Sequence, residues 1–248
     1  DMKVGAVEVQ RHMTALSRTN FSAPIQLLLR SGLLSPEASL FDYGCGRGTD
    51  VEGLAAQGYN ATGWDPHYAP LQDRRVADVV NLGFVVNVIE DPSERVDAIR
   101  AAARLARRVL AVSVMLNNNQ NAGTPYQDGF ISTRKTFQKY FTQDELREYL
   151  EHVLDSTPVM AAPGIALHFT DKEWEQRYLS NRYQRQDLSR RLLDSVASRI
   201  AHRPALKRTV EPRISKEAQL LEIAVALAEA EEWLAECRIN ERGALERL

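Results

Sequence analysis

The stretch at residues 40–66, LFDYGCGRGTDVEGLAAQGYNATGWDP, joins two short apolar segments through a glycine-rich turn and a helical pattern. Residues 39–44 have the pattern of a buried strand, and residues 59–65 have that of a second strand, which ends at Asp65. A strand, a helix and a strand within about 30 residues predict a right-handed βαβ unit.

The helix of this unit carries its own start and stop signals. Thr49 is the predicted N-cap, because Glu52 follows it at the spacing of a capping box. Gly58 is a natural residue for the C-terminal end of the helix.

The same alternation continues downstream. Apolar segments predict strands, whereas Asp91 and Thr142 stand at cap positions ahead of helical patterns. The predicted strands are 77–86, 108–116 and a pair within 158–169, and the predicted helices are 23–34, one starting at Asp91–Pro92, and 142–153. Alternating strands and helices predict an α/β fold with a Rossmann-like, doubly wound sheet.

The glycine turn points to a cofactor. A glycine turn at a strand end, followed by a helix start, suits a phosphate or a carboxylate. Gly44, Gly46 and Gly48 form G-x-G-x-G, and Thr49 occupies the position where the dinucleotide fingerprint requires glycine. Together with Asp42, this loop resembles motif I of class I S-adenosylmethionine-dependent methyltransferases.

That resemblance implies S-adenosyl-L-methionine as cofactor, with the loop around its methionine end and the end of strand 77–86 beside its methyl group. Asp65 closes the second strand, where a carboxylate can accept both ribose hydroxyls. The predicted cofactor contacts are Asp42, Tyr43, Gly44, Cys45, Gly46, Gly48, Asp65, Pro66, Asn81, Leu82, Gly83 and Phe84. The plainer alternative is a cluster of turn glycines near an unrelated aspartate, with incidental asparagines in a core strand.

One interval departs from the expected pattern. Only eleven residues separate Asp65 from Ala77, too few for a usual second crossover helix and third strand. The acid that often contacts the adenine amino group therefore has weak candidates only, Asp73 and Asp78.

Several stretches between about residues 10 and 170 are together similar to one family, the methyltransferases associated with DNA phosphorothioation systems. They are RHMTALSR, FDYGCGRGTD, GWDP, ADVVNLGFVVNVIEDPSER, TFQKYFTQDELREYL and the APG before the last strand. This resemblance implies DNA modification, although relatives could serve small-molecule pathways.

Two regions are candidates for the acceptor pocket. The segment RHMTALSR could fold over the site as a lid or be an ordinary exposed helix, and the loop at 117–140 follows a strand end where such folds bind ligands. Catalytic candidates are His12, Arg18 and Asn87, and substrate-binding candidates are Arg11, Tyr126, Phe130, Lys135 and Tyr140. No metal site is predicted. The motifs of amino-methylating DNA enzymes are absent, as is a Pro-Cys nucleophile, because Cys45 lies in the glycine loop.

The C-terminal part divides by charge. Residues 177–213 hold ten Lys/Arg against three Asp/Glu, whereas residues 214–248 hold four against eight. The basic stretch could follow a phosphate backbone, or pair with the acidic helix within a chain or across a homodimer. We expect three parts: a helical lid segment at 1–38, a cofactor-binding domain at 39–170 and a helical region at 171–248.

Composition fits a globular protein, with 44% apolar and 26% charged residues and a net charge of −2 over 248 residues. We find no membrane-spanning apolar run and no signal segment, and the two distant cysteines favour a reducing, cytoplasmic setting. The leading expectation is a methyltransferase whose acceptor is nucleic acid or a nucleotide-like compound. The alternatives are a methyltransferase of a small aromatic or heterocyclic metabolite and a non-catalytic scaffold with this fold.

Overall fold

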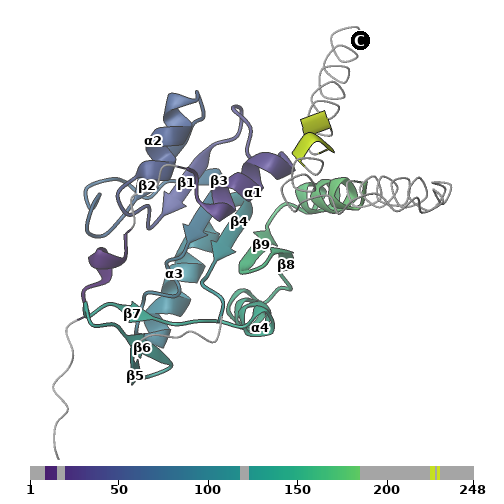
Figure 1. Cartoon of the computed structure of the whole chain (residues 1–248). Coiled ribbons are helices and arrows are strands. Elements are labelled where there is room, and N and C mark those ends of the chain that lie inside the picture. Colours follow the sequence, from purple (N-terminus) through teal and green to yellow (C-terminus); the bar gives the residue numbers. More distant parts are fainter. Residues whose placement is uncertain (1–8, 16–19, 118–122, 185–223, 227, 230–248) are drawn as a thin grey trace, which may run out of the picture. The chain divides into compact units, whose positions relative to one another are not determined.

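The computed structural model describes residues 9–15, 20–117, 123–184, 224–226 and 228–229. The chain divides into two compact units, Asp1–Arg191 and Leu192–Leu248. The first unit contains all the strands of the described residues (Figure 1).

A six-stranded sheet in the order β2-β1-β3-β4-β9-β8 forms the centre of this unit. Its strands are β2 (Ala61–Trp64), β1 (Leu40–Tyr43), β3 (Ala77–Gly83), β4 (Ala106–Ser113), β9 (Ile165–Phe169) and β8 (Val159–Ala162). The first four are parallel, and β9 runs antiparallel to both β4 and β8. The prediction of a Rossmann-like, doubly wound sheet is therefore confirmed.

Helices cover both faces of the sheet, which explains why its central strands are apolar on both sides. One face packs with α1 (Ala23–Ser31) and α2 (Thr49–Ala56), and the other with α3 (Pro92–Leu105) and α4 (Gln143–Leu154). Successive residues of β1 alternate between the two cores: Leu40 belongs to the α1 side and Phe41 to the α3 side.

Two of the three predicted helix caps are present. The Asp91 side chain accepts a hydrogen bond from the Ser93 amide, and Thr142 forms a complete capping box with Glu145. The third prediction was wrong by one residue: Gly48, in the left-handed conformation, is the N-cap of α2, and Thr49 is already helical. The turn that brings the backbone into α2 requires a positive φ, which glycine adopts without strain.

The short interval after β2 contains no crossover, as its length predicted. Residues 66–76 form turns and contain neither a helix nor a strand. The sheet consequently ends at β2 and lacks the neighbouring strand, and the helix that would accompany that strand is missing too.

The segment predicted as a loop at 117–140 instead contains a second, three-stranded antiparallel sheet, β5 (Thr124–Tyr126), β6 (Gly129–Ile131) and β7 (Phe137–Gln138). Below, the range 124–141 is called the cap. The short strands turn at Gln127–Asp128, where Gln127 has a positive φ of 49°.

Two observations bear on where the predicted parts meet. Within the predicted lid segment, Ile25 and Leu28 of α1 are fully buried against the sheet. Residues 172–184 form a helix whose Tyr178 is 7% exposed and contacts Phe169 of β9, so the first unit continues past residue 170. The predicted homodimer contacts and nearly all of the basic and acidic stretches lie outside the described residues. No helix among those residues is long and apolar enough to cross a membrane.

Two glycines allow a controlled test of the loop that follows β1. Gly44 (φ 81°) and Gly58 (φ 84°) share a left-handed backbone, but an added Cβ would clash with Val85 at Gly44 and meet nothing at Gly58. We expect Gly58→Ala to lower the free energy of unfolding by about 1–2 kcal/mol. Gly44→Ala should cost about 1–3 kcal/mol more from overpacking. Urea denaturation measures both, and equal losses would show that the Val85 contact is unimportant.

Candidate functional site

A cavity of about 570 Å³ lies at the carboxyl ends of the parallel strands. Its walls come from the ends of β1, β2 and β3, the segment after each, one side of α3, and the N-terminal residues Arg11–Ala15. β1 lies between β2 and β3, so the cavity opens where the strand order reverses. Doubly wound folds bind ligands at this position, and the volume is that of a small-molecule site.

The glycine loop is held by the carboxylate of Asp65. One carboxylate oxygen accepts the Gly46 amide at 3.0 Å, and the other accepts the His67 and Tyr68 amides at 2.9 Å each. The loop amides of Gly44 and Cys45 both donate to the Trp64 carbonyl. The end of β2 therefore fixes the glycine loop on one side and the turn at 66–68 on the other.

Beneath the loop, two buried polar side chains lie in register on neighbouring strands. Asp42 of β1 pairs with Asn81 of β3, and the Asn81 amide nitrogen donates to the Asp42 carboxylate at 2.8 Å. Asn81 is 2% exposed and lines the cavity, and its Oδ1 has no hydrogen-bond partner among the residues that the structure describes. The buried hydroxyl of Ser22 is a second such atom in the wall. Buried polar atoms normally have partners, so these two are suited to a bound polar ligand.

The thiol of Cys45 has low nucleophilic reactivity. Burial, with a further contribution from the carboxylates of Asp42 and Asp65, raises its pKa to about 12. The thiolate, which is the nucleophilic form, is therefore scarce at neutral pH.

The cavity continues around the strand ends onto the α3 side. Tyr43 and Trp64 stand in register on β1 and β2 with ring centroids 5.2 Å apart, and the Arg74 guanidinium lies 3.9 Å from the Trp64 centroid. Ala98 and Ala101 of α3 line the same part of the cavity. This lobe occupies the side of the sheet that the missing crossover leaves uncovered.

The segment after β3 forms a third wall. Phe84 has a φ of 60°, which is uncommon for a residue with a side chain, and it lines the cavity with Val85, Val88 and Ile89. Backbone strain of this kind is concentrated at functional sites.

Residues 10–15, called the lid below, border the cavity and include a short 3₁₀ helix at Arg11–Thr14. The Arg11 guanidinium binds the carboxylates of both Glu90 and Glu94 through four hydrogen bonds of 2.6–2.9 Å. Tyr68 donates to the His12 carbonyl, and the His12 and His67 rings stack with centroids 4.2 Å apart.

These contacts change the electrostatics of the lid. Burial raises the pKa of Glu90, but the hydrogen bonds from Arg11, a backbone hydrogen bond and the positive charge of Arg11 together outweigh it, so the net pKa is lowered. The same two carboxylates raise the pKa of Arg11 further. The Arg11 guanidinium is therefore already paired with two carboxylates. This pairing makes Arg11 less suited to its predicted role of contacting the substrate.

Ten of the twelve predicted cofactor residues line the cavity: Asp42, Tyr43, Gly44, Cys45, Gly46, Asp65, Pro66, Asn81, Gly83 and Phe84. Gly48 and Leu82 do not. Leu82 points into the hydrophobic core of the α3 side and is fully buried, because its side chain alternates with that of Asn81. Gly48 serves as the helix cap instead.

Only some of the residues predicted to act in catalysis or to bind the substrate line the cavity. His12 lines the cavity, as does Arg11. Arg18 lies outside the described residues. Asn87 is 1% exposed and absent from the cavity wall, so a catalytic contact through its side chain is not supported.

The four predicted substrate contacts Tyr126, Phe130, Lys135 and Tyr140 are also absent from the wall, since they belong to the cap. The carbonyl of Lys135 nevertheless accepts the Gln10 amide and so holds the lid.

Sequence reasoning missed several residues of the wall: Ser22, Trp64, His67, Tyr68, Arg74 and the side of α3. The cluster GWDPHY at 63–68 carries a usable signal, because aromatic and histidine side chains surround the predicted strand-end acid. Nothing local identifies Ser22 or α3, which reach the site through tertiary packing.

The sequence profile of a family described as "Methyltransferase domain" matches residues 13–153. No curated protein matches significantly. Among solved structures, the chain is similar to the 1,6-didemethyltoxoflavin-N1-methyltransferase of Burkholderia thailandensis, solved with its substrate and S-adenosylhomocysteine. The identity is 17%, the TM-score is 0.42, and the match covers 66% of this chain and 80% of that one.

Two further solved structures are similar to this chain at comparably low identity. A sugar N-methyltransferase from Streptoalloteichus shows 15% identity and a TM-score of 0.44, with 62% of this chain and 89% of that chain covered. Magnesium protoporphyrin IX methyltransferase from Synechocystis shows 18% identity and a TM-score of 0.37, with 59% and 75% covered.

The high pKa of Cys45 predicts slow alkylation. In a Cys237→Ser variant, which leaves Cys45 alone, we expect iodoacetamide at pH 8 to react about a thousandfold more slowly than with free cysteine. The same variant in denaturing urea should react at the ordinary rate and serves as the control. A native rate within tenfold of free cysteine would contradict the assignment.

Proposed function

We propose, from the premise that this chain belongs to the methyltransferase domain family, that the cavity binds the cofactor and a compact methyl acceptor side by side. The protein is an S-adenosylmethionine-dependent methyltransferase, and its cofactor is S-adenosyl-L-methionine. When bound, that cofactor supplies a methyl group already activated on a sulfonium, so the chain has to align the partners more than to activate them.

The observation that carries the proposal is the Asp42–Asn81 pair. A carboxylate and an unpartnered amide oxygen, both buried and both in the cavity wall, form an acceptor set for an ammonium group. The amino group of an amino-acid tail has the matching three donors. Buried acceptors of this kind cost free energy when unpaired, so a bound ammonium relieves that cost.

Asp65 is the proposed ribose contact. Its carboxylate already accepts three amides, and a carboxylate offers about four lone-pair positions. One further hydroxyl donor therefore fits without disturbing the loop. This is a narrower role than accepting both ribose hydroxyls.

The lobe on the α3 side is the proposed adenine site. Trp64 and Tyr43 offer ring surfaces, Ala98 and Ala101 leave space, and Arg74 supplies a planar cation. These groups suit a flat base by stacking and cation–π contact. Neither weak acid candidate lines the cavity: Asp78 accepts hydrogen bonds from Ser39 before β1, and Asp73 is exposed beside Arg75.

The lid and the wall after β3 are the proposed acceptor side. His12 of the lid stacks on His67 of the turn after β2, both line the cavity, and an imidazole nitrogen can accept a proton from an acceptor that must lose one. A cavity of about 570 Å³ beneath an ion-paired lid favours a nucleotide-like or heterocyclic compound over an extended strand. The nucleic-acid part of the leading expectation rested on the family resemblance and on the basic stretch 177–213, most of which lies outside the described residues.

Cofactor binding tests the proposal directly. Asp65→Ala should weaken S-adenosylmethionine binding by at least ~1–3 kcal/mol, because a ribose hydroxyl and three amides lose their acceptor. Asp73→Ala, which removes an exposed acid from the following turn, is the matched control and should leave affinity unchanged. Isothermal titration calorimetry measures both. Absence of binding to the unaltered chain would favour the scaffold alternative, and an unaffected Asp65→Ala variant would remove the ribose assignment.

The acceptor class has its own test. We expect the full chain to give no discrete complex with DNA or RNA in electrophoretic mobility shifts at about 150 mM salt, since the proposed acceptor is compact. A retarded complex whose affinity falls steeply between two salt concentrations would instead support a nucleic-acid acceptor.

A further inference from the structure

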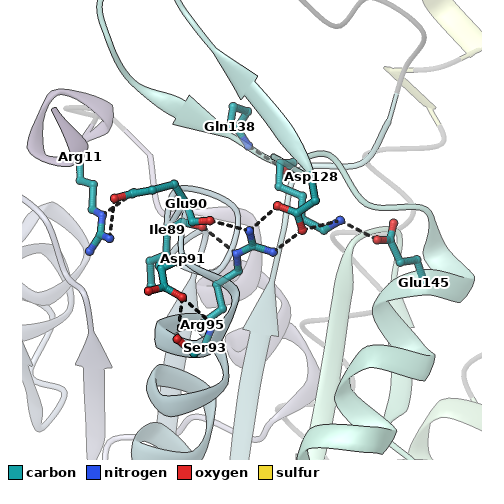
Figure 2. Close-up of polar contacts among 10 residues, drawn as sticks. Arg11, Ile89, Glu90, Asp91, Ser93, Arg95, Asp128, Gln138 and Glu145 are labelled. Carbon is teal, nitrogen blue, oxygen red and sulfur yellow. Dashed lines mark hydrogen bonds and ion pairs between the residues drawn. The ribbon is translucent and has the colours of Figure 1, made fainter. Parts of the chain in front are cut away.

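Arg95 is a buried charged side chain that the proposed chemistry does not use. It lies in the first turn of α3, is 2% exposed, and is absent from the cavity wall. Figure 2 shows its guanidinium between two groups of acceptors, one from the segment after β3 and one from the cap. Burying a cation is costly unless every donor finds a partner, so these contacts define its role.

The first group is main chain. Arg95 Nε donates to the Ile89 carbonyl at 2.7 Å, and a terminal nitrogen donates to the Glu90 carbonyl at 3.1 Å. Ile89 lines the cavity, and the Glu90 side chain receives Arg11 of the lid. Arg95 thereby fixes the backbone from which Glu90 reaches the lid.

The second group is Asp128, at the turn between β5 and β6. Its two carboxylate oxygens accept the two terminal nitrogens of Arg95 at 2.7 and 2.5 Å, which is a bidentate pair. Lys139 lies 3.3 Å from the same carboxylate and 2.7 Å from Glu145 of α4. The guanidinium hydrogen bond holds the pKa of Asp128 below its usual range.

Two main-chain hydrogen bonds also connect the cap to the segment after β3 and to the lid. The Lys139 amide donates to the Asn87 carbonyl, and the Gln10 amide donates to the Lys135 carbonyl. The cap therefore touches the segment after β3 and the lid independently of Arg95. The segment after β3 and the cap contact Arg95 directly, and the lid joins both of them through Glu90 and Lys135.

We propose that Arg95 is a positioning residue that couples the lid to the cap, so that the cap helps to hold the lid at the cavity. The hydrogen bonds from Arg95 to the Ile89 and Glu90 carbonyls fix the backbone that places the Glu90 side chain beside Arg11. The bidentate pair with Asp128 holds the cap against the same backbone. Breaking one partner of a buried ion pair leaves the other uncompensated, which makes the assembly cooperative. The ligand beneath is the cofactor of the proposed function, on which this inference rests.

If Arg95 had only a structural role, substituting it would lower the overall stability of the protein and would have no selective effect on the lid. The coupling instead predicts that a change in the cap loosens residues 10–15, which Asp128 does not touch.

Asp128→Asn is the main test, because it places an NH₂ group against the guanidinium at a half-exposed site outside the cavity. Asp144→Asn on α4 is the matched control, since Asp144 is exposed and makes only a long surface ion pair with Arg147. Arg95→Lys is the second variant; it keeps the charge but loses the bidentate geometry.

Two readouts are compared with the melting temperature of each variant. The first is amide hydrogen exchange of Met13 and Ala15, whose N–H groups donate to carbonyls within the lid; Gln10 is left out because its N–H donates directly to Lys135 of the cap. The second is release of labelled S-adenosylmethionine into excess unlabelled cofactor. We expect both rates to rise about tenfold in Asp128→Asn and Arg95→Lys and to stay unchanged in Asp144→Asn.

The outcomes separate the two proposals. Unchanged lid exchange in both network variants overturns the coupling, as does faster exchange confined to the cap. If the unaltered chain does not bind the cofactor, the proposed function fails, whereas the exchange measurement still decides the coupling.

Discussion

The arrangement of the cavity depends on a single carboxylate at the end of β2. Asp65 accepts amides from the glycine loop and from the turn at 66–68, so it fixes both sides of the crevice at once. Tyr68 in that turn then holds the lid through the His12 carbonyl. A carboxylate that accepts several main-chain amides is a strong local organiser, because charge-assisted hydrogen bonds are roughly twice as strong as neutral ones.

The shortened connection between β2 and β3 shapes the rest of the crevice. A usual crossover would add a strand beyond β2 and a helix beside α3, and eleven residues cannot provide them. Side chains fill part of that space: Trp64 and Tyr43 from the strand ends, with Arg74 across the indole. The consequence is a lobe whose wall consists of aromatic rings and an exposed arginine instead of packed secondary structure.

Two arginines beside the site are neutralised by carboxylates of the same chain. Arg11 is matched by Glu90 and Glu94, and Arg95 by Asp128, with backbone carbonyls completing its shell. Ion pairs that are partly withdrawn from water fix geometry more than they add stability. The same side chains that would attract an anionic acceptor from solution therefore hold the lid and the cap in place.

Local sequence determined the parts whose signals act over a few residues. The strand at 39–44, the caps at Asp91 and Thr142, and the short interval after Asp65 all appear in the structure, since capping and alternation involve near neighbours. The glycine loop and Asp65 line one cavity, because parallel strands end at one edge of the sheet.

Only the tertiary structure decided what the side chains face. Asn81 and Leu82 are neighbours with opposite directions, so one lines the cavity and the other fills the core. Arg11 meets partners 79 and 83 residues away, and Arg95 meets Asp128 33 residues away, distances over which no periodicity carries information. The sequence by itself determined the sheet and the edge where the site lies; packing of remote segments decided which polar groups remain available there and which pair with one another.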